Sequence, residues 1–455
     1  MSNTMRLTII ALIATAAAAA PPHIVVYLAD DLGGLDTTVY GSKDVRTPNL
    51  ERLASSGMTF ENAFIASPAC APSRAALLTG LMPARNGAEA NHTYPKSGTQ
   101  FLTATLKKQG YEIASFGKVA HGADKPEYGF DYYSQPRVDL AKHVADYFGK
   151  RDSDAPLLLM VGDRRPHVPW TTDNIYDPAK ITLPPYFIDT PETREHRGRY
   201  YSDITGLDAE MGRIFEIAKK ELGDDVVYLF TSDHGGQWPY GKWNLYEAGI
   251  HVPLIMAWQA KVASNKRTEA MVSWIDVFPT LIELAGGDVP SGIDGRSFAG
   301  VLSGKNEEHR SEIFTTHSGD GVYNAYPIRS IRTKRYKYIL NLLPGHLHTN
   351  HSDILRKDGA GAFWDSWDEA AKKDPQAEQI IQSYFERPEE EFYDLKADSL
   401  EQNNLAGAPA QRKRLGELKG RLEAWMAEQR DQETVFNTPY PADGPRPTAE
   451  TVRRN

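Results

Sequence analysis

The sequence predicts a large α/β domain built on a mostly parallel sheet flanked by helices, followed by a smaller α+β subdomain. Between residues 23 and 310, short valine-rich apolar runs alternate with helical patterns. Two of these runs, at 23–31 and 225–236, end in acidic residues, as strands do when a site lies beyond their carboxyl ends. After residue 310, the chain changes to strand patterns joined by turns, which are typical of antiparallel pairing.

Local patterns place the elements of the α/β domain. The run HIVVYLADD at 23–31 is short, apolar and rich in valine, so we expect a buried strand. A helix is expected at 47–57, with Thr47 as N-cap, Pro48 at the first helical position and Gly57 at its end. Similar patterns predict strands at 111–117, 155–162, 225–236 and 251–258, and helices at 101–110, 191–222 and 274–287.

The C-terminal third has a different pattern of expected secondary structure. Strands joined by turns are expected within 327–342 and 389–398, which predicts an antiparallel sheet, and a helix is expected at 409–429. The proline-rich stretch at 437–450 predicts irregular surface chain. We therefore divide the chain into an α/β domain at 23–310 and a C-terminal subdomain at 311–455.

The N-terminus has the pattern of a signal peptide. Arg6 precedes an apolar run of 14 residues from Leu7 to Ala20, which is too short to cross a bilayer. We expect residues 1–18 to be removed and the protein to be exported, either to the periplasm or out of the cell. An uncleaved anchor or a buried first helix is the alternative.

Composition narrows the class of partner. The 41% hydrophobic and 24% charged residues are typical of a soluble globular protein. The net charge of −9 argues against binding to nucleic acid or to an anionic membrane, but leaves a small anionic substrate open. The single cysteine, Cys70, has no partner for an internal disulfide, so it serves either packing or chemistry.

Acidic side chains follow two strands whose sequences are similar. Asp30 and Asp31 end one strand, and Asp233 and His234 end the other. If the strands are neighbours, three carboxylates converge and repel one another unless a cation lies among them. Oxygen ligands favour Ca²⁺ or Mg²⁺. The alternative is that each acid caps a following turn or helix.

The segment CAPSR at 70–74, followed by LLTG, resembles the signature of the type I sulfatases. Further stretches in the order of that family include TPNLERLASSGMTFENAF, PHVPW and TSDHG, so the resemblance covers nearly the whole chain. It implies an alkaline-phosphatase-like fold. It also implies that a maturation enzyme oxidises Cys70 to formylglycine.

The resemblance implies a role for each residue of the site. One hydroxyl of the hydrated aldehyde at position 70 would attack sulfur, and the second would later expel sulfate. Asp30, Asp31, Asp233 and His234 would bind one Ca²⁺ together with residue 70, although asparagine is common where this chain has His234. Arg74 would steady the diol, Lys118 and Lys242 would bind sulfate oxygens, His121 would accept the proton of the second hydroxyl, and His167 would bind sulfate or protonate the leaving group. The family spacing often places the histidine two residues after the lysine, whereas His121 follows Lys118 by three.

Local likenesses indicate the substrate class. The stretches at 241–254 and 318–342 resemble the heparan N-sulfatase (sulfamidase) branch, whereas TSDHG and GKVAH resemble iduronate-2-sulfatase. We expect a sulfated saccharide, in particular N-sulfoglucosamine of heparin or heparan sulfate, contacted by His92, His317 and Arg329. An O-sulfated algal polysaccharide or another glycosaminoglycan fragment is the competing substrate. A phosphodiesterase or phosphonate hydrolase of the same fold, and a non-catalytic glycan-binding protein with unconverted Cys70, remain the alternatives of other kinds.

Overall fold

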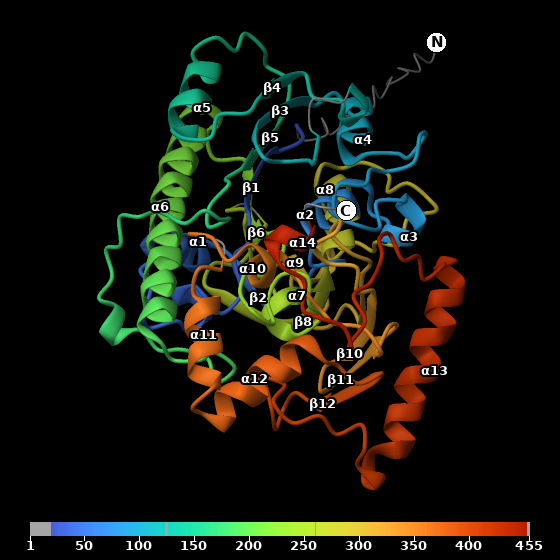
Figure 1. Cartoon of the computed structure of the whole chain (residues 1–455). Coiled ribbons are helices and arrows are strands. Elements are labelled where there is room, and N and C mark those ends of the chain that lie inside the picture. Colours follow the sequence, from blue (N-terminus) through green and yellow to red (C-terminus); the bar gives the residue numbers. More distant parts are fainter. Residues whose placement is uncertain (1–19, 123–125, 260, 360, 453–455) are drawn as a thin grey trace, which may run out of the picture.

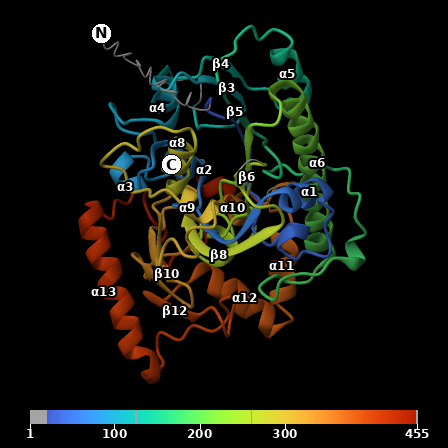
Figure 2. The ribbon, with the colours of Figure 1, turned by 180° about the vertical axis from the view of Figure 1, so that it is seen from behind.

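The computed structural model describes residues 20–122, 126–259, 261–359 and 361–452. The predicted signal peptide at 1–18 lies outside these residues. Within them, no helix has both the length and the apolar character that a membrane span requires. The long helices α6 (Pro191–Leu222) and α13 (Arg412–Gln429) lie on opposite sides of the molecule in both views (Figures 1 and 2).

A wide sheet forms the centre of the molecule. Within the described residues it has eight strands in the order β4-β3-β5-β1-β6-β7-β2-β8, and only β7 runs antiparallel to its neighbours. The predicted class, a mostly parallel α/β sheet, is confirmed. The strands are β1 His23–Ala29, β2 Met58–Phe64, β3 Glu112–Gly117, β4 Tyr132–Ser134, β5 Leu157–Gly162, β6 Val226–Ser232, β7 Leu254–Ala257 and β8 Lys266–Ser273.

Helices cover both faces of this sheet. Strand β1 is buried on both sides, which is why its sequence is an unbroken apolar run. Val26 belongs to a core with leucines of α2, α4 and α8, whereas the next residue, Tyr27, belongs to a core with α1, α5 and α6. The helices of this region are α1 Pro48–Ser56, α2 Cys70–Thr79, α3 Pro83–Asn86, α4 Leu102–Lys108, α5 Leu140–Phe148, α7 Glu247–Ile250, α8 Val277–Leu284 and α9 Ala299–Leu302.

A second, antiparallel sheet follows, in agreement with the predicted subdomain. Its order is β12-β11-β10-β9, with β9 Glu312–His317, β10 Ile328–Thr333, β11 Tyr336–Asn341 and β12 Glu390–Asp394. Leu418 and Leu422 of α13 pack with Ile331 and Phe392 of this sheet. The remaining helices are α10 His351–Leu355, α11 Trp364–Ala371, α12 Pro375–Phe385 and α14 Ala449–Val452. The division at 310/311 stays a prediction.

Several elements depart from the sequence expectations. The elements β2, β8, α11 and α12 were not predicted. Helix α12 was missed although it has local signals, with Asp374 as N-cap, Pro375 at the first helical position and buried apolar residues at 377, 381, 384 and 385.

Thr47 precedes α1 as expected, but its hydroxyl hydrogen-bonds to Thr38 and does not cap the helix. Instead, the carboxylate of Asp208 on α6 accepts from the backbone N–H groups of Asn49 and Leu50.

Candidate active site

The carboxyl ends of β1 and β6 place four polar side chains together. These strands are parallel neighbours, with Ala29 opposite Ser232, so the two residues after each strand are adjacent. The backbone N–H of Asp31 donates to Oδ1 of Asp233 at 3.0 Å. Asp31 has a φ of 70°, a left-handed conformation that is costly for an aspartate and common at functional sites. The predicted convergence therefore occurs.

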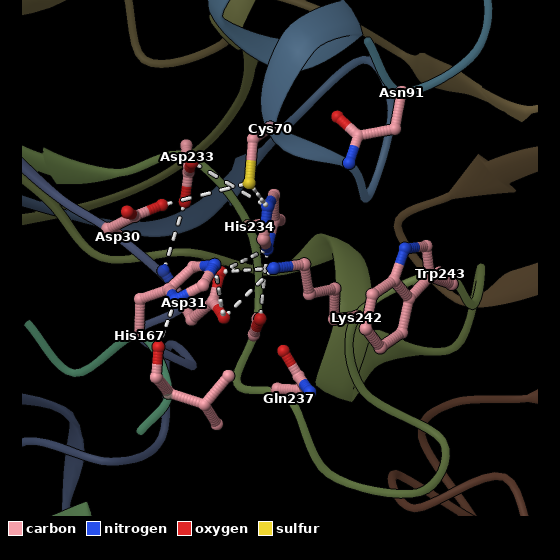
Figure 3. Close-up of polar contacts among 12 residues, drawn as sticks. Asp30, Asp31, Cys70, Asn91, His167, Asp233, His234, Gln237, Lys242 and Trp243 are labelled. Atoms are coloured by element: carbon pink, nitrogen blue, oxygen red, sulfur yellow. Dashed lines mark hydrogen bonds and ion pairs between the residues drawn. The ribbon is translucent and has the colours of Figure 1, made fainter. Parts of the chain in front are cut away.

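Helix α2 carries Cys70 into this cluster at its first residue. The hydroxyl of Ser73 donates to the backbone carbonyl of Asp233 at 2.6 Å, which ties the first turn of α2 to the end of β6. The sulfur of Cys70 lies 3.4 Å from Nε2 of His234 and 3.8 Å from Oδ1 of Asp30. Figure 3 shows the aspartates and His234 gathered around this sulfur.

The cluster has the donor set of a metal site. One ligand atom each of Asp31, Cys70, Asp233 and His234 lie within 4.8 Å of one another, and all four residues are buried. Asp30 is buried beside them. Burial raises the pKa of Asp233 to about 6, because its charged form is poorly solvated there. Buried carboxylates gathered around one point suit a hard divalent cation, so the residues fit the expected Ca²⁺.

Three cationic side chains surround the same cluster. Lys118, just after β3, lies 3.2 Å from the sulfur of Cys70, and Lys242 lies 2.9 Å from Oδ1 of Asp31. Nε of Arg74 lies 2.9 Å from Oδ2 of Asp233. Burial works to raise the pKa of the Cys70 thiol, but Lys118, Lys242 and His234 hold it well below its usual value. The site therefore favours negative charge at position 70.

Arg74 has a nitrogen available for a ligand. Its Nη2 atom is buried without a hydrogen bond, although it lies 3.3 Å from Oδ1 of Asp30. A buried guanidinium N–H without an acceptor is costly, and an anion bound in the site would satisfy it. Arg74 lies one helical turn after Cys70 on α2, so both side chains reach the same point.

His167 lies at the open side of the cluster. Its Nε2 atom is 4.0 Å from Oδ2 of Asp31, and its side chain is 31% exposed. Burial works to lower the pKa of His167, but the Asp31 carboxylate outweighs it and raises the pKa above its usual value. Its Nδ1 atom lies 2.6 Å from the backbone carbonyl of Val168. A protonated imidazole at this place can donate to an anion or to a leaving group.

His121 and His92 form a hydrogen-bonded pair. Nε2 of His121 lies 2.9 Å from Nδ1 of His92, and the rings meet edge to face. Burial lowers the pKa of His121 to about 4, so this ring is neutral at pH 7. His121 follows Lys118 by three residues, where the family spacing is often two. It lies in the same loop after β3 as Lys118 and contacts His92.

The two remaining predicted substrate contacts lie deeper in the protein. Nε2 of His317 lies 3.0 Å from Oδ1 of Asn324, and His317 is buried. Arg329 on β10 pairs with the carboxylate of Asp431, with both side chains 1% exposed. Its Nη1 atom donates to the backbone carbonyl of His317 at 2.8 Å. Contact of these two residues with a sugar stays a prediction.

The structure also brings together polar residues that the sequence patterns did not single out. Asp320, in the loop between β9 and β10, accepts from Nε1 of Trp243 at 2.7 Å and from Nδ2 of Asn91 at 2.9 Å. Oδ1 of Asn91 accepts from the backbone N–H of Ala71, at the start of the helix that carries Cys70. The ring of His351 stacks on Trp243 beside Lys242 (Trp243 and Lys242 in Figure 3). The local signals were the stretches at 241–254 and 318–342, which contain Trp243 and Asp320, and the position of Asn91 beside His92.

Comparisons with known proteins identify the family to which the chain belongs. The family model described as sulfatase matches residues 22–287, and the one described as N-sulphoglucosamine sulphohydrolase, C-terminal, matches residues 234–344. An ulvan-active sulfatase of Formosa agariphila is 29% identical over 423 residues, covering 90% of this chain and 81% of that protein. The N-sulphoglucosamine sulphohydrolase of Homo sapiens is 26% identical over 476 residues, covering 91% of each chain.

A solved structure supports the fold. It is described as a complex with its substrate D-glucosamine-2-N,6-O-disulfate, and it superposes with a TM-score of 0.69 at 20% identity, covering 92% of this chain and all of that chain. The sulfatase model matches more than half of the 455 residues, so the chain belongs to the sulfatase family. The protein is accordingly a hydrolase of sulfate esters or sulfamates.

Proposed function

We propose that the protein is an exported sulfatase that removes sulfate from a saccharide, using formylglycine at position 70 and one Ca²⁺. The observation that carries this proposal is the place of the Cys70 sulfur, within 3.4 Å of both Lys118 and His234. A thiol kept for packing alone does not require a buried lysine and a buried imidazole at its sulfur. A maturation enzyme is needed to convert the cysteine.

The buried acids would hold the metal. Asp30, Asp31, Asp233 and His234, with residue 70, are the proposed ligands, and the metal would lower the pKa of a hydroxyl at position 70 and polarise a sulfate oxygen. Position 70 would supply the nucleophile once it is an aldehyde hydrate. The buried Nη2 atom of Arg74 is a donor for an oxygen at that position.

The neighbouring cations would bind the sulfate group. Lys118 and Lys242 each contact an aspartate of the cluster, so their ammonium groups are held close to residue 70. Charge spreads over the sulfate oxygens in the transition state, and cations already in place stabilise it without reorganisation. His167, whose pKa is raised, would donate a proton to the departing oxygen or nitrogen.

The substrate that we propose first is N-sulfoglucosamine from heparin or heparan sulfate. The match of residues 234–344 to the model named for N-sulphoglucosamine sulphohydrolase supports it. The 63% exposed side chain of His92, together with those of His167 and His351, at 31% and 24%, offers donors to a sulfated sugar. An O-sulfated algal polysaccharide is the second candidate, supported by the likeness to the ulvan-active sulfatase.

A substrate panel tests both candidates. The converted protein is incubated with Ca²⁺ and either N-sulfated glucosamine, O-sulfated glucosamine or sulfated ulvan oligosaccharides, and free sulfate is measured. We expect the highest kcat/KM for the N-sulfated sugar. Turnover of the ulvan oligosaccharides alone would move the assignment to the second candidate, and release of sulfate from none of them would contradict a saccharide sulfatase.

A further inference from the structure

The imidazole ring of His351 lies beside the proposed sulfate-binding groups. It stacks on the ring of Trp243, with the centroids 5.1 Å apart and the planes at 16°. The ammonium group of Lys242 lies 5.0 Å from the centroid of the same Trp243 ring. We infer that His351 is a specificity residue, which hydrogen-bonds to a hydroxyl of the sugar that carries the sulfate, and that Tyr440 is a positioning residue for it. This inference rests on the proposed function.

The ring of His351 is fixed with one edge toward the protein. Its Nδ1 atom is buried and lies 3.8 Å from Oδ2 of Asp320. The ring of Tyr323 lies 4.1 Å from it, centroid to centroid. Trp243 is fixed in turn, because its Nε1 atom donates to Asp320 at 2.7 Å. The exposed 24% of the His351 side chain therefore belongs to its other atoms, among which Nε2 is the polar one.

The charge state of His351 suits a hydroxyl better than a second sulfate. Burial and the cation of Lys242 lower the pKa of His351 to about 4, although Asp320 works to raise it. His92 and His167 act in the same direction as Lys242, so the ring lies within the electrostatic reach of the site. A neutral imidazole donates to or accepts from a hydroxyl, but it offers no positive charge to an anion.

Two loops meet at His351 and are tied to each other. The loop between β9 and β10 carries Tyr323, and the loop after β11 leads into His351 at the start of α10. The hydroxyl of Thr349 donates to the backbone carbonyl of Tyr323 at 2.8 Å, and Nδ2 of Asn324 donates to the backbone carbonyl of Thr349 at 2.7 Å. Thr349 and Asn324 are both buried. A shift of either loop would therefore move the ring of His351.

Tyr440 of the C-terminal segment contacts both loops. Its hydroxyl donates to the backbone carbonyl of Val322 at 2.6 Å, in the loop between β9 and β10. Its own backbone carbonyl accepts from the N–H of Leu347 at 2.7 Å, and Ala442 continues this pairing. The proline-rich stretch at 437–450, which the sequence predicted only as irregular surface chain, thus holds the two loops that present His351.

Binding measured without turnover tests the contact with sugar. The Cys70→Ala protein, in the presence of Ca²⁺, is titrated by NMR with inorganic sulfate, N-sulfated glucosamine, O-sulfated glucosamine and sulfated ulvan oligosaccharides. We expect at least one sulfated sugar to bind more tightly than inorganic sulfate. Adding His351→Ala should weaken the binding of that sugar by about three- to tenfold, as for loss of one hydrogen bond. The Kd of inorganic sulfate should not change, which also shows that the site remains folded.

The variant Tyr440→Phe tests the positioning role, because it removes only the hydroxyl that reaches Val322. We expect a smaller loss of affinity for the same sugar, with the Kd of inorganic sulfate unchanged. We expect no further loss when it is combined with His351→Ala, since both act through one contact. Tyr111→Phe is the matched control, because the hydroxyl of Tyr111 also donates to a backbone carbonyl at 2.6 Å, that of Pro22, at the opposite ends of the strands.

Three results would overturn the contact of His351 with sugar. They are sulfated sugars that bind no more tightly than inorganic sulfate, an unchanged sugar affinity in His351→Ala, and equal losses for sugar and inorganic sulfate. Losses from His351→Ala and Tyr440→Phe that add in full, or a Tyr440→Phe protein that binds sugar like the Tyr111→Phe control, would overturn the positioning role. The proposed function fails separately, if converted wild-type enzyme releases no sulfate from any of these sugars, while the Kd values still decide the contact.

Discussion

The ammonium group of Lys118 contacts both carboxylate oxygens of Asp30, at 2.8 and 2.7 Å. Asp30 is buried, and although burial works to raise its pKa, Lys118 together with His167 and Arg74 holds that pKa below its usual value. The same nitrogen lies 3.2 Å from the sulfur of Cys70. Lys118 therefore links the proposed metal site to the proposed nucleophile.

Removal of this lysine should slow catalysis strongly. We expect Lys118→Ala to lower kcat by about a hundredfold or more, as when one preorganised charge-stabilising group is lost. Initial rates of sulfate release from a sulfated saccharide check this. Lys261→Ala is the control, since Lys261 lies on the surface over the ring of Trp258. A Lys118→Ala enzyme as fast as this control would mean that the site is wrongly assigned.

Arg74 can be tested in the same way. Its Nε atom pairs with Asp233, while Nη2 is buried without a hydrogen bond, so we expect it to meet an oxygen at position 70. Arg74→Ala should lower kcat by about a hundredfold or more. Measured rates close to wild type would remove Arg74 from the catalytic groups.

Divalent metal should be required for activity. Treatment with a chelator should abolish sulfate release, and Ca²⁺ should restore it, because buried carboxylates around one point bind hard cations. Metal content per chain and Ca²⁺ titration by calorimetry are the measurements. Asp233→Asn should weaken Ca²⁺ binding. Full activity in the chelator, with no metal found in the protein, would contradict this prediction.

The variant Arg329→Ala distinguishes a structural role of Arg329, which its buried ion pair favours, from the predicted contact with a sugar. Its guanidinium and Asp431 form an ion pair in which both side chains are 1% exposed. Breaking such a buried pair from one side costs about 3–5 kcal/mol of folding free energy, because the remaining charge is left unpaired. We expect Arg329→Ala to lower the free energy of unfolding by that amount, as measured in urea, with KM unchanged. A raised KM at normal stability would instead support the predicted contact with sugar.

The sequence predicted the centre of the site because its signals are local. Asp30 and Asp31 directly follow a valine-rich strand, as Asp233 does, and Cys70 and Arg74 lie in one short motif. Parallel neighbouring strands then bring their ends together without further information. Helix α6 was predicted at its observed bounds, and the structure shows local signals at both ends, with Thr190 as N-cap before Pro191 and Gly223 directly after the last turn.

The rest of the site depends on long-range packing. Asp320 and Asn91 are 229 positions apart in the chain, and nothing in either loop indicates that they hydrogen-bond. Trp243 and His351 likewise come from separate segments that meet only in the folded protein.

Helices α11 and α12 pack their aromatic residues against each other, with Trp364 beside Tyr384 and Phe385. Trp367 of α11 also donates to the hydroxyl of Thr193 on α6, a contact that neither segment's own sequence indicates.

The central claim is that Cys70 is converted to formylglycine, which then acts as the nucleophile. In Cys70→Ala we expect no sulfate release and an intact fold, since the buried side chain loses only its sulfur. The most direct measurement is the mass of the peptide that carries residue 70, from protein made in a host able to convert it. The account predicts an aldehyde or its hydrate at that position. An unmodified thiol in protein that still releases sulfate would contradict it.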